Sequence, residues 1–297
     1  MRFLFVDRIV EMSPGQIIRG VKHVTSDDTF LTTDEQGRPC FIPSLIGETL
    51  GQLAAWNVMQ CNGFTQRPVA GIVASACLHR PAYVGETLLL ESFIDNLDER
   101  AVQYHSIARV GDDTVFSIEG ALGPLLPMAD FIAPEEVAQQ FAEINNPGDW
   151  GSISLMCSPV LDDYSIANPA LSTVSMTFDR IRSCQAGVSL VAEKCITRAA
   201  PYFPDHFPLK PVLPMTVLLE CKLNLAREFI ARAGYSLSYR VSELRKIKMN
   251  EFVHPGEVIE CSVTVKRQTD EELILAFRSE VDGKRVCVVD VVLIRLR

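Results

Sequence analysis

One histidine in this chain lies where an acid–base catalyst could work. His206 belongs to the stretch PYFPDHFPLKPVLPMTVLLE, residues 201–220, and an apolar segment that carries Glu220 follows it. A neutral imidazole titrates near physiological pH and can therefore remove a proton from a substrate. A carboxyl group on an apolar helix is desolvated, which raises its pKa and lets it deliver a proton. The stretch thus has residue types suited to acid–base catalysis.

A second stretch has the same layout without the histidine. Residues 30–48, FLTTDEQGRPCFIPSLIGE, carry Asp34 at the position that corresponds to His206, and they end at Glu48. Gln52 follows Glu48 by one helical turn, so it lies on the same face of a helix and can orient that carboxyl group. The acid is therefore present twice, but the histidine only once.

The two stretches belong to an internal repeat with a constant offset of 172 residues. Between 5–48 and 177–220, eight residues are identical: Asp7, Arg8, Ile9, Gly15, Lys22, Thr25, Pro39 and Glu48 in the first copy. Beyond the apolar segment the match resumes with the offset moved by one, so that Gly85-Glu86 corresponds to Gly256-Glu257. A repeat of this length indicates duplication of a domain and not a short-period solenoid.

Both copies predict the same elements in the same order. Helices are expected near residues 43–61 and 214–233, with Pro43 and Pro214 in the first turn, where proline is tolerated. Both are apolar nearly all round and must be wrapped by other elements. The following segments alternate polar and apolar residues and contain Gly-Asp and Asp-Gly turns, which favours antiparallel hairpins. Each copy is therefore predicted to be a buried helix in a curled antiparallel sheet, and the copies are expected to pair edge to edge.

These elements divide the chain into an α+β fold with two similar domains. The first is expected over residues 1–125 and the second over 172–297. A connector over 126–171 contains a predicted short helix, APEEVAQQFAEI, and then a Pro/Gly/Asn-rich crossing, NNPGDWGS. The opening residues MRFLFVDRIVEM reach charged side chains too early for a signal peptide, so they are predicted to form the first strand.

Composition excludes several classes of function. The net charge of −9 disfavours nucleic-acid binding, and no apolar stretch approaches the roughly 20 residues that span a membrane. The nine cysteines are scattered without a CxxC pair, which disfavours zinc and indicates reduced thiols in the cytoplasm. Neither a metal nor a cofactor is expected, because the remaining histidines fit no metal site and are interpreted as strand or turn residues: His23, His79, His105 and His254.

Several motifs together resemble one enzyme family. HFPLKPVLPMTVLLE resembles the H-F-P-G-x-P-x-x-P-G…E stretch of the 3-hydroxyacyl-acyl-carrier-protein dehydratases, which have the hot-dog fold. In the first copy, FLFVDRIVEMSPGQIIRGVKHVT resembles the family's N-terminal strand pair, and ETLGQ resembles its E-x-x-x-Q helix motif. The spacing of 14 residues from His206 to Glu220 is that of the family. The resemblance covers most of both copies and implies a double hot-dog.

The resemblance also implies how the two copies share their residues. In the family's dimers each site takes its histidine from one subunit and its acid from the other. In a fused pair, one working site would combine His206 with Glu48 and Gln52. The second, vestigial site would contain only the set Asp34, Glu220 and Asn224.

The substrate tunnel departs from the family pattern at two positions. Leu209 and Met215 replace family glycines, and three consequences are open: a narrower tunnel, a displaced oxyanion donor, or a copy that binds substrate without turnover. The resemblance places the substrate-binding residues in the histidine loop and at the start of the second helix: Phe207, Pro208, Leu209, Pro214 and Met215. Backbone N–H groups at that helix N-terminus are natural donors to an enolate-like thioester oxygen.

The chain is therefore expected to dehydrate (3R)-3-hydroxyacyl thioesters of a carrier protein or coenzyme A, in fatty-acid or polyketide-like synthesis. The alternatives are a hot-dog thioesterase, an acyltransferase or decarboxylase of a natural-product pathway, and a non-catalytic acyl-binding module. The basic segment ELRKIKMNE, residues 243–251, either is a solvated strand face or docks an acidic carrier protein through Arg245, Lys246 and Lys248. A monomer with an internal pseudo-dimer, or a homodimer of double hot-dogs, is expected.

Overall fold

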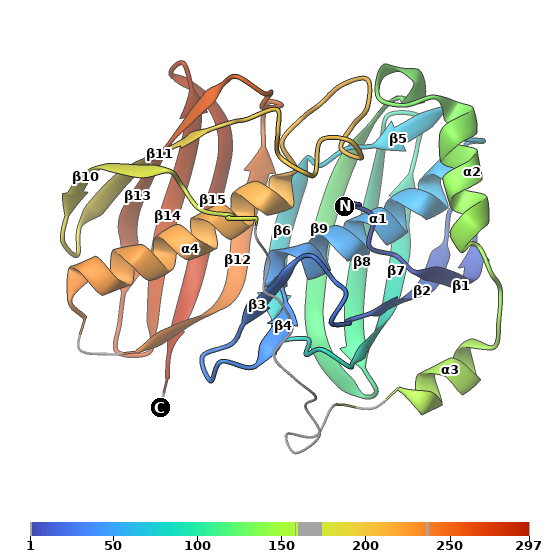
Figure 1. The fold of residues 1–297 in the computed structure, drawn as a ribbon, viewed down its shortest axis with the longest axis horizontal. Coiled ribbons are helices and arrows are strands. Elements are labelled where there is room, and N and C mark those ends of the chain that lie inside the picture. Colours follow the sequence, from blue (N-terminus) through green and yellow to red (C-terminus); the bar gives the residue numbers. More distant parts are fainter. Residues whose placement is uncertain (1, 158, 160–173, 236–237, 297) are drawn as a thin grey trace.

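Two long helices lie across one face of a large antiparallel sheet (Figure 1). The structure, a computed structural model, describes residues 2–157, 159, 174–235 and 238–296. The first half contains β1 (Arg8–Ser13), β2 (Ile17–His23), β3 (Leu31–Thr33), β4 (Pro39–Phe41), α1 (Pro43–Cys61), β5 (Gln66–Pro68), β6 (Ile72–Leu78), β7 (Thr87–Leu97), β8 (Ala101–Val110) and β9 (Asp113–Pro127). A short helical turn, η1 (Met128–Asp130), and two helices, α2 (Pro134–Ile144) and α3 (Trp150–Met156), follow. The second half contains β10 (Arg180–Gln185), β11 (Ser189–Cys195), α4 (Met215–Ala233), β12 (Tyr239–Met249), β13 (Val258–Gln268), β14 (Glu272–Val281) and β15 (Lys284–Arg295).

The main sheet runs through both halves of the chain. Its strand order is β1-β2-β7-β8-β9-β6-β12-β15-β14-β13-β11-β10, and the short β5 pairs with β9 outside this path. The halves meet where β6 pairs antiparallel with β12, with Ala76 opposite Leu244. The edge-to-edge pairing of the two copies predicted from the repeat is therefore present. The predicted hairpins also form, as β8–β9 and β14–β15.

The repeat extends to individual hydrogen bonds. The ladder between β10 and β11 has the register and the bulge of the ladder between β1 and β2, moved by 172 residues. The Asp7 carboxylate accepts a hydrogen bond from the backbone N–H of His23, and the Asp179 carboxylate accepts one from Cys195, both at 2.6 Å. Duplicated sequence has thus produced duplicated geometry.

The long helices begin and end as their end residues dictate. Pro43 occupies the first turn of α1, whereas Pro214 precedes α4 as its N-cap and does not lie in the first turn as predicted. Its extended backbone, with ψ of 134°, cannot belong to a helix. Gly234 ends α4 in the left-handed conformation that suits glycine.

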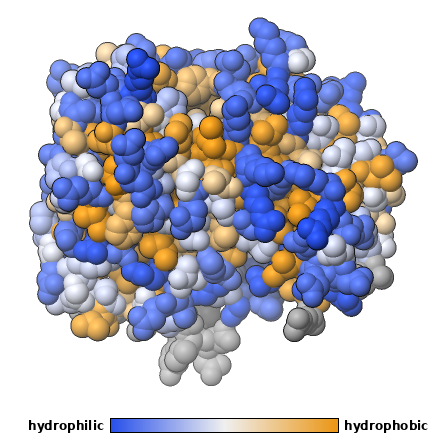
Figure 2. All heavy atoms as spheres, turned by 180° about the vertical axis from the view of Figure 1, so that it is seen from behind, coloured by the Kyte–Doolittle hydropathy of each residue, from blue (hydrophilic) through white to orange (hydrophobic). Residues whose placement is uncertain are grey.

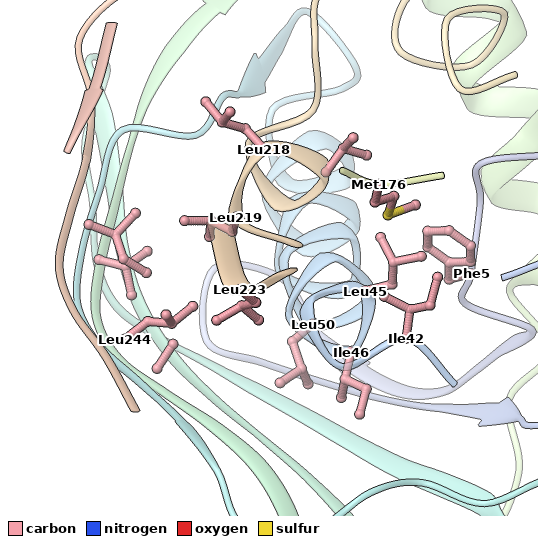
Figure 3. Packing of buried hydrophobic residues seen from close by; sticks show 14 of the residues in the cluster. Phe5, Ile42, Leu45, Ile46, Leu50, Met176, Leu218, Leu219, Leu223 and Leu244 are labelled. Carbon is pink, nitrogen blue, oxygen red and sulfur yellow. The ribbon is translucent and has the colours of Figure 1, made fainter. Parts of the chain in front are cut away.

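A single hydrophobic core joins the two helices to the sheet. Figure 3 shows Leu45, Ile46 and Leu50 of α1 near side chains of α4. All three are completely buried. Leu218, Leu219 and Leu223 of α4 and Leu244 of β12 belong to the same cluster. The halves are therefore packed together as well as hydrogen-bonded.

Two segments differ from the sequence predictions. The first strand begins only at Arg8, because the preceding residues cross α1 and pair with a side-chain amide there. The predicted irregular crossing contains α3, where the Asp149 carboxylate caps the helix by accepting from the N–H of Gly151 at 3.1 Å. The basic segment 243–251 lies mostly within β12, at the junction of the halves, and its last two residues follow the strand.

The two faces of the sheet have different surroundings. The helices α1 and α4 cover one face, and α3 packs on the other through Trp150 and Ile153, against a small cluster of Val10, Val21 and Leu89. Figure 2 shows the molecule from behind, where polar and apolar side chains are mixed.

Within the described ranges, no helix is both long and apolar enough to cross a bilayer. The predicted connector helix is α2, and residues 160–171 of the connector lie outside the described residues.

Candidate active site

The loop before α4 fixes the orientation of His206. Its backbone N–H donates to the carbonyl of Tyr202 at 2.9 Å, and its own carbonyl accepts from Val212 at 3.1 Å. The ring Nδ1 lies 2.9 Å from the Val212 carbonyl oxygen. A carbonyl oxygen can only accept a hydrogen bond, so Nδ1 carries the proton and Nε2 is left with a free lone pair. His206 is thereby held in the tautomer that acts as a base through Nε2.

Glu48 is held by residues of both halves. Its Oε2 accepts a hydrogen bond from the Thr216 hydroxyl of α4 at 2.6 Å, and its Oε1 accepts from Gln52 Nε2 at 3.0 Å. Gln52 is itself fixed by the N-terminal segment, since it donates to the Phe3 carbonyl at 3.0 Å and accepts from the Phe5 N–H at 2.9 Å. The carboxyl group therefore has a defined position at the junction of α1 and α4.

His206 and Glu48 line the same cavity, together with Gln52. The cavity has a volume of about 190 Å³ and lies between α1, the sheet and the histidine loop. Its wall is largely apolar and includes Trp56 and Phe116. The structure thus brings together the histidine of the second copy and the acid of the first, beside space for an apolar chain.

The surroundings of His206 favour its neutral form. Burial lowers the pKa of His206 below its ordinary value of 6.5. The charge of Glu48 and the hydrogen bond to Val212 oppose this shift, whereas the positive charge of Arg67 adds to it. An imidazole with a lowered pKa is unprotonated at neutral pH, as a general base must be.

The N-terminus of α4 opens into the cavity. Met215 and Thr216 are the first two residues of this helix, and both line the cavity. The first N–H groups of an α-helix have no partner within the helix and carry partial positive charge. This helix end can therefore donate hydrogen bonds to an oxygen that becomes negative during a reaction.

The expected substrate-binding residues are placed in different surroundings. Phe207 and Met215 line the cavity. Pro208 lines a neighbouring hollow, and Pro214 is the N-cap of α4. Leu209 is 66% exposed, and its N–H donates to the Phe131 carbonyl at 3.0 Å. Because this exposed side chain does not line the cavity, Leu209 does not narrow it, contrary to one of the sequence predictions.

Asp34 lies in a hydrogen-bonded network of its own loop. Its carboxylate accepts from Nε of Arg38 at 2.8 Å, from the Tyr83 hydroxyl at 2.9 Å and from the N–H groups of Gln36 and Arg38. Burial raises the pKa of Asp34, but these hydrogen bonds outweigh it, so that the pKa is lowered. An ionised, fully engaged carboxylate of this kind is a poor base.

The other residues of the second set are also engaged. Glu220 accepts from the N–H of Ser44 at 3.3 Å and lies 3.7 Å from Arg227. Asn224 donates to the carbonyl of Met176 at 2.8 Å and accepts from Arg227 at 2.6 Å. The equivalents of Glu48 and Gln52 are thus arranged similarly, beside an aspartate network in place of a histidine.

The basic residues of β12 differ in their exposure. Arg245 forms an ion pair of 2.7 Å with Glu243. Lys246 and Lys248 are exposed, and Lys246 has a positive φ of 55° at an irregularity of the strand. Within the described part of the chain, no cluster of His, Cys, Asp and Glu has the size of a metal site.

Three residues of the site were missed by the sequence analysis. Thr216 corresponds to Ser44 in the repeat, so a hydroxyl at both positions was a usable signal. Arg67 and Tyr104 also line the cavity. Neither belongs to a motif, and only the fold shows that they face the cavity.

Comparisons with known proteins identify the family to which the chain is related. The family model described as ApeI-like, ApeI dehydratase, matches residues 182–289. The 3-hydroxyacyl-[acyl-carrier-protein] dehydratase FabZ of Wolbachia pipientis (strain wPip) is 31% identical over 114 residues, which are 38% of this chain and 80% of that protein. FabZ of Caldanaerobacter subterraneus is 32% identical over 120 residues, covering 39% of this chain and 84% of that protein.

Solved structures of low identity share the fold. A putative oleoyl thioesterase from Lactobacillus plantarum covers 96% of this chain and 100% of its own, with a TM-score of 0.57 and 11% identity. The dehydratase domain of PpsC from Mycobacterium tuberculosis covers 98% of both chains, with a TM-score of 0.56 and 12% identity. These likenesses identify a hot-dog fold, and the FabZ matches add the family. The chain therefore belongs to the family of 3-hydroxyacyl-acyl-carrier-protein dehydratases, which are hydro-lyases.

Proposed function

We propose that the protein dehydrates (3R)-3-hydroxyacyl thioesters at one composite site, made by His206 of the second half and by Glu48 and Gln52 of the first. The observation that carries this proposal is the shared cavity, which His206 and Glu48 both line. The Nδ1 hydrogen bond to Val212 leaves the other ring nitrogen of His206 free to act as the base. The family membership supports the same reaction class.

The reaction needs one base, one acid and one oxyanion donor. Nε2 of His206 removes a proton from the carbon next to the thioester carbonyl. The N-terminus of α4 stabilises the enolate-like oxygen that results. Glu48, oriented by Gln52, serves as the proton donor to the departing hydroxyl, which leaves as water. Transfer of a proton from the imidazolium to Glu48 restores the site, and the net change is the loss of one water.

The same proposal assigns the two halves to two hot-dog units. Residues 1–125 would form the first unit, residues 172–297 the second, and residues 126–171 the connector. The duplicated ladders of β1–β2 and β10–β11 support this division. The second composite site, made by Asp34 of the first unit with Glu220 and Asn224 of the second, would be vestigial. The hydrogen-bonded network around Asp34 leaves no base there.

The thioester is proposed to be carried by acyl carrier protein, or by coenzyme A, in fatty-acid or polyketide-like synthesis in the cytoplasm. The printed names of the FabZ relatives support the carrier-protein substrate. The exposed Lys246 and Lys248, with Arg245 beside them, would dock the acidic carrier. The double unit would act as a monomer or as a homodimer. Phe207 and Met215 would contact the acyl thioester. The loop around it would be shaped by Pro208, Leu209 and Pro214.

Mass spectrometry of acyl carrier proteins tests the proposal. The protein is incubated with 3-hydroxyacyl and enoyl carrier-protein panels, and the mass of each carrier is followed. The expected result is loss of one water from the hydroxyacyl form, gain of one water by the enoyl form, and neither change with His206→Ala. Release of the free carrier thiol without an enoyl product would contradict dehydration and indicate a thioesterase.

A further inference from the structure

Arg67 is a charged residue in the cavity that the proposed reaction does not use. It belongs to β5 and lines the cavity, and its Nε is buried without a hydrogen-bond partner. Its guanidinium carbon lies 3.6 Å from the centre of the Phe207 ring and 5.6 Å from that of Phe131. Within the described residues, no carboxylate forms an ion pair with it. Arg67 as a whole is partly exposed, but its guanidinium packs against aromatic rings, and its buried Nε has no partner.

Among the described residues, the Arg67 guanidinium lacks the hydrogen bonds and the counter-charge that a cation in this position needs. A buried cation is stable only when hydrogen bonds and an opposite charge replace its lost hydration, and aromatic faces replace only part of it. Burial lowers the pKa of Arg67 to about 9, with Glu48 as the opposing influence, so the guanidinium still carries its charge at neutral pH. An acceptor that enters the cavity would complete its hydrogen bonding.

A second polar group without a partner faces the same cavity. Tyr104 of β8 lines it, and its hydroxyl lies 3.7 Å from the position of a Cβ on Gly51. No residue in the described ranges hydrogen-bonds to this hydroxyl. Burial, with the charge of Glu48, raises the pKa of Tyr104 to about 12, so the hydroxyl keeps its proton and remains a donor. The cavity thus offers two unused donors in a largely apolar wall.

The position of Arg67 relative to the reacting atoms follows from Phe207. The His206 ring stacks on Phe207 at 4.1 Å and 24°, and the guanidinium lies 3.6 Å from the same ring centre. The imidazole and the guanidinium are too close to the Phe207 ring to share one of its faces, so they lie on opposite faces. The Phe207 ring therefore separates Arg67 from His206, so Arg67 meets a part of the substrate other than the carbons that react at His206.

We propose that Arg67 binds a carboxylate on the acyl chain of the substrate, so that the enzyme selects 3-hydroxyacyl thioesters with a carboxylated chain over plain ones. This inference rests on the proposed function and specifies its substrate class. The guanidinium offers several N–H donors in a plane, which match the two oxygens of a carboxylate. Tyr104 supplies a further donor to the same chain.

Kinetics with matched substrates test this selection. The substrates are the pantetheine thioesters of 3-hydroxyhexanoate and of 3-hydroxyadipate, which have the same chain length and differ in the terminal carboxylate. We expect the wild type to prefer the carboxylated thioester by at least about tenfold in kcat/KM, the scale of a polar contact in a dry site. Arg67→Met should abolish this preference, and Arg67→Lys should keep part of it. An unchanged preference in Arg67→Met, or a wild type that prefers the plain chain, would overturn the proposal.

A matched control separates binding from support of the loop. Lys210 also lies over Phe131, at 5.1 Å, but it does not line the cavity. Lys210→Met should therefore leave the preference between the two substrates unchanged. If Arg67 only supports Phe207, its substitution lowers kcat/KM for both substrates by the same factor, and the proposal fails. Arg67→Lys gives the same comparison if Arg67→Met does not fold.

Binding without turnover separates this inference from the proposed function. Calorimetry with hexanoyl and adipoyl pantetheine, which lack the 3-hydroxyl, measures recognition alone. Tighter binding of adipoyl pantetheine by the wild type, lost in Arg67→Met, would support the inference even if no substrate is dehydrated. The same measurement is repeated with N-acetylcysteamine thioesters, which lack most of the pantetheine arm. If Arg67→Met weakens binding of the pantetheine thioesters but not of the N-acetylcysteamine thioesters, Arg67 binds the pantetheine arm and the inference is wrong.

Discussion

The helices α1 and α4 occupy equivalent places in the two halves and both reach the cavity, but they line it with side chains of different size. Gly47 and Gly51 of α1 line the cavity, and the corresponding residues of α4 are Leu219 and Leu223, which are 5% and 3% exposed. Leu219 also lines the cavity, whereas Leu223 is packed in the core, so equivalent helix positions contribute open space in α1 and apolar side chains in α4. The glycines of α1 therefore add to the space beside Glu48, which lines the same cavity.

The two loops before the helices differ in the same sense. Among the described residues, the His206 ring has one hydrogen bond, to Val212; it packs against Phe3 and Phe207 and lines the cavity. Asp34 is surrounded by donors from Arg38, Tyr83 and the backbone of its own loop. One loop therefore keeps its titratable group available, and the other uses it to hold the loop together.

The largest effect should come from exchanging the two equivalent acids for amides. Glu48→Gln removes the proton donor, and we expect dehydration to fall by about 10²–10⁴-fold, as for loss of a general acid. Glu220→Gln should keep most of the activity. Single-turnover assays with a 3-hydroxyacyl carrier protein measure both. Equal losses would mean that both sites work and that the halves are functionally equivalent.

Filling the cavity should make α1 resemble α4. Gly51→Leu places a leucine where α4 has Leu223, so we expect long acyl chains to lose at least about tenfold in kcat/KM while short chains lose less. Gly51→Ala is the matched control, since a Cβ there meets only ordinary contact at 3.7 Å. The same loss for all chain lengths would show that the acyl chain does not pass Gly51.

Removing the charge of Asp34 should affect stability and not activity. Asp34→Asn weakens the hydrogen bonds to Arg38 and Tyr83, and we expect the free energy of unfolding to fall by about 1–3 kcal/mol at neutral pH. Because the pKa of Asp34 is lowered in the folded state, this difference should persist above the ordinary aspartate value and disappear as the pH falls through the lowered pKa. Urea unfolding at several pH values measures it. Loss of dehydration in a folded variant would give Asp34 a role in catalysis.

The smallest expected effect is a displacement of the pH profile. Burial lowers the pKa of His206, so the acid limb of kcat/KM should lie below 6.5, since the neutral imidazole persists to lower pH. Glu48 opposes this shift and Arg67 adds to it, so Arg67→Met should move the limb to higher pH. A limb that stays in place would show that the two groups are electrostatically independent.

The sequence predicted those parts of the fold that repeat along the chain. The constant offset predicted both helices and the paired edges, because equivalent strands must pair equivalently. The proximity of His206 to Glu48 was expected from the family resemblance, in which each site takes its histidine from one copy and its acid from the other. The course of the first residues could not be predicted, because their partner is the side chain of Gln52 and not another strand. The sequence also could not predict that the Arg67 side chain faces the cavity, because a three-residue strand has no alternation of polar and apolar residues to show which way its side chains point. The roles of the site residues remain predictions for the experiments above.

The junction of β6 and β12 within one polypeptide has a genetic consequence. In a symmetric homodimer every substitution appears twice, so a histidine lost from one site is lost from both. Here the partners are separate stretches of a single reading frame, and a change in one is not copied to the other. One half can therefore evolve toward structural support while the other retains its reactive group, which a homodimer cannot do.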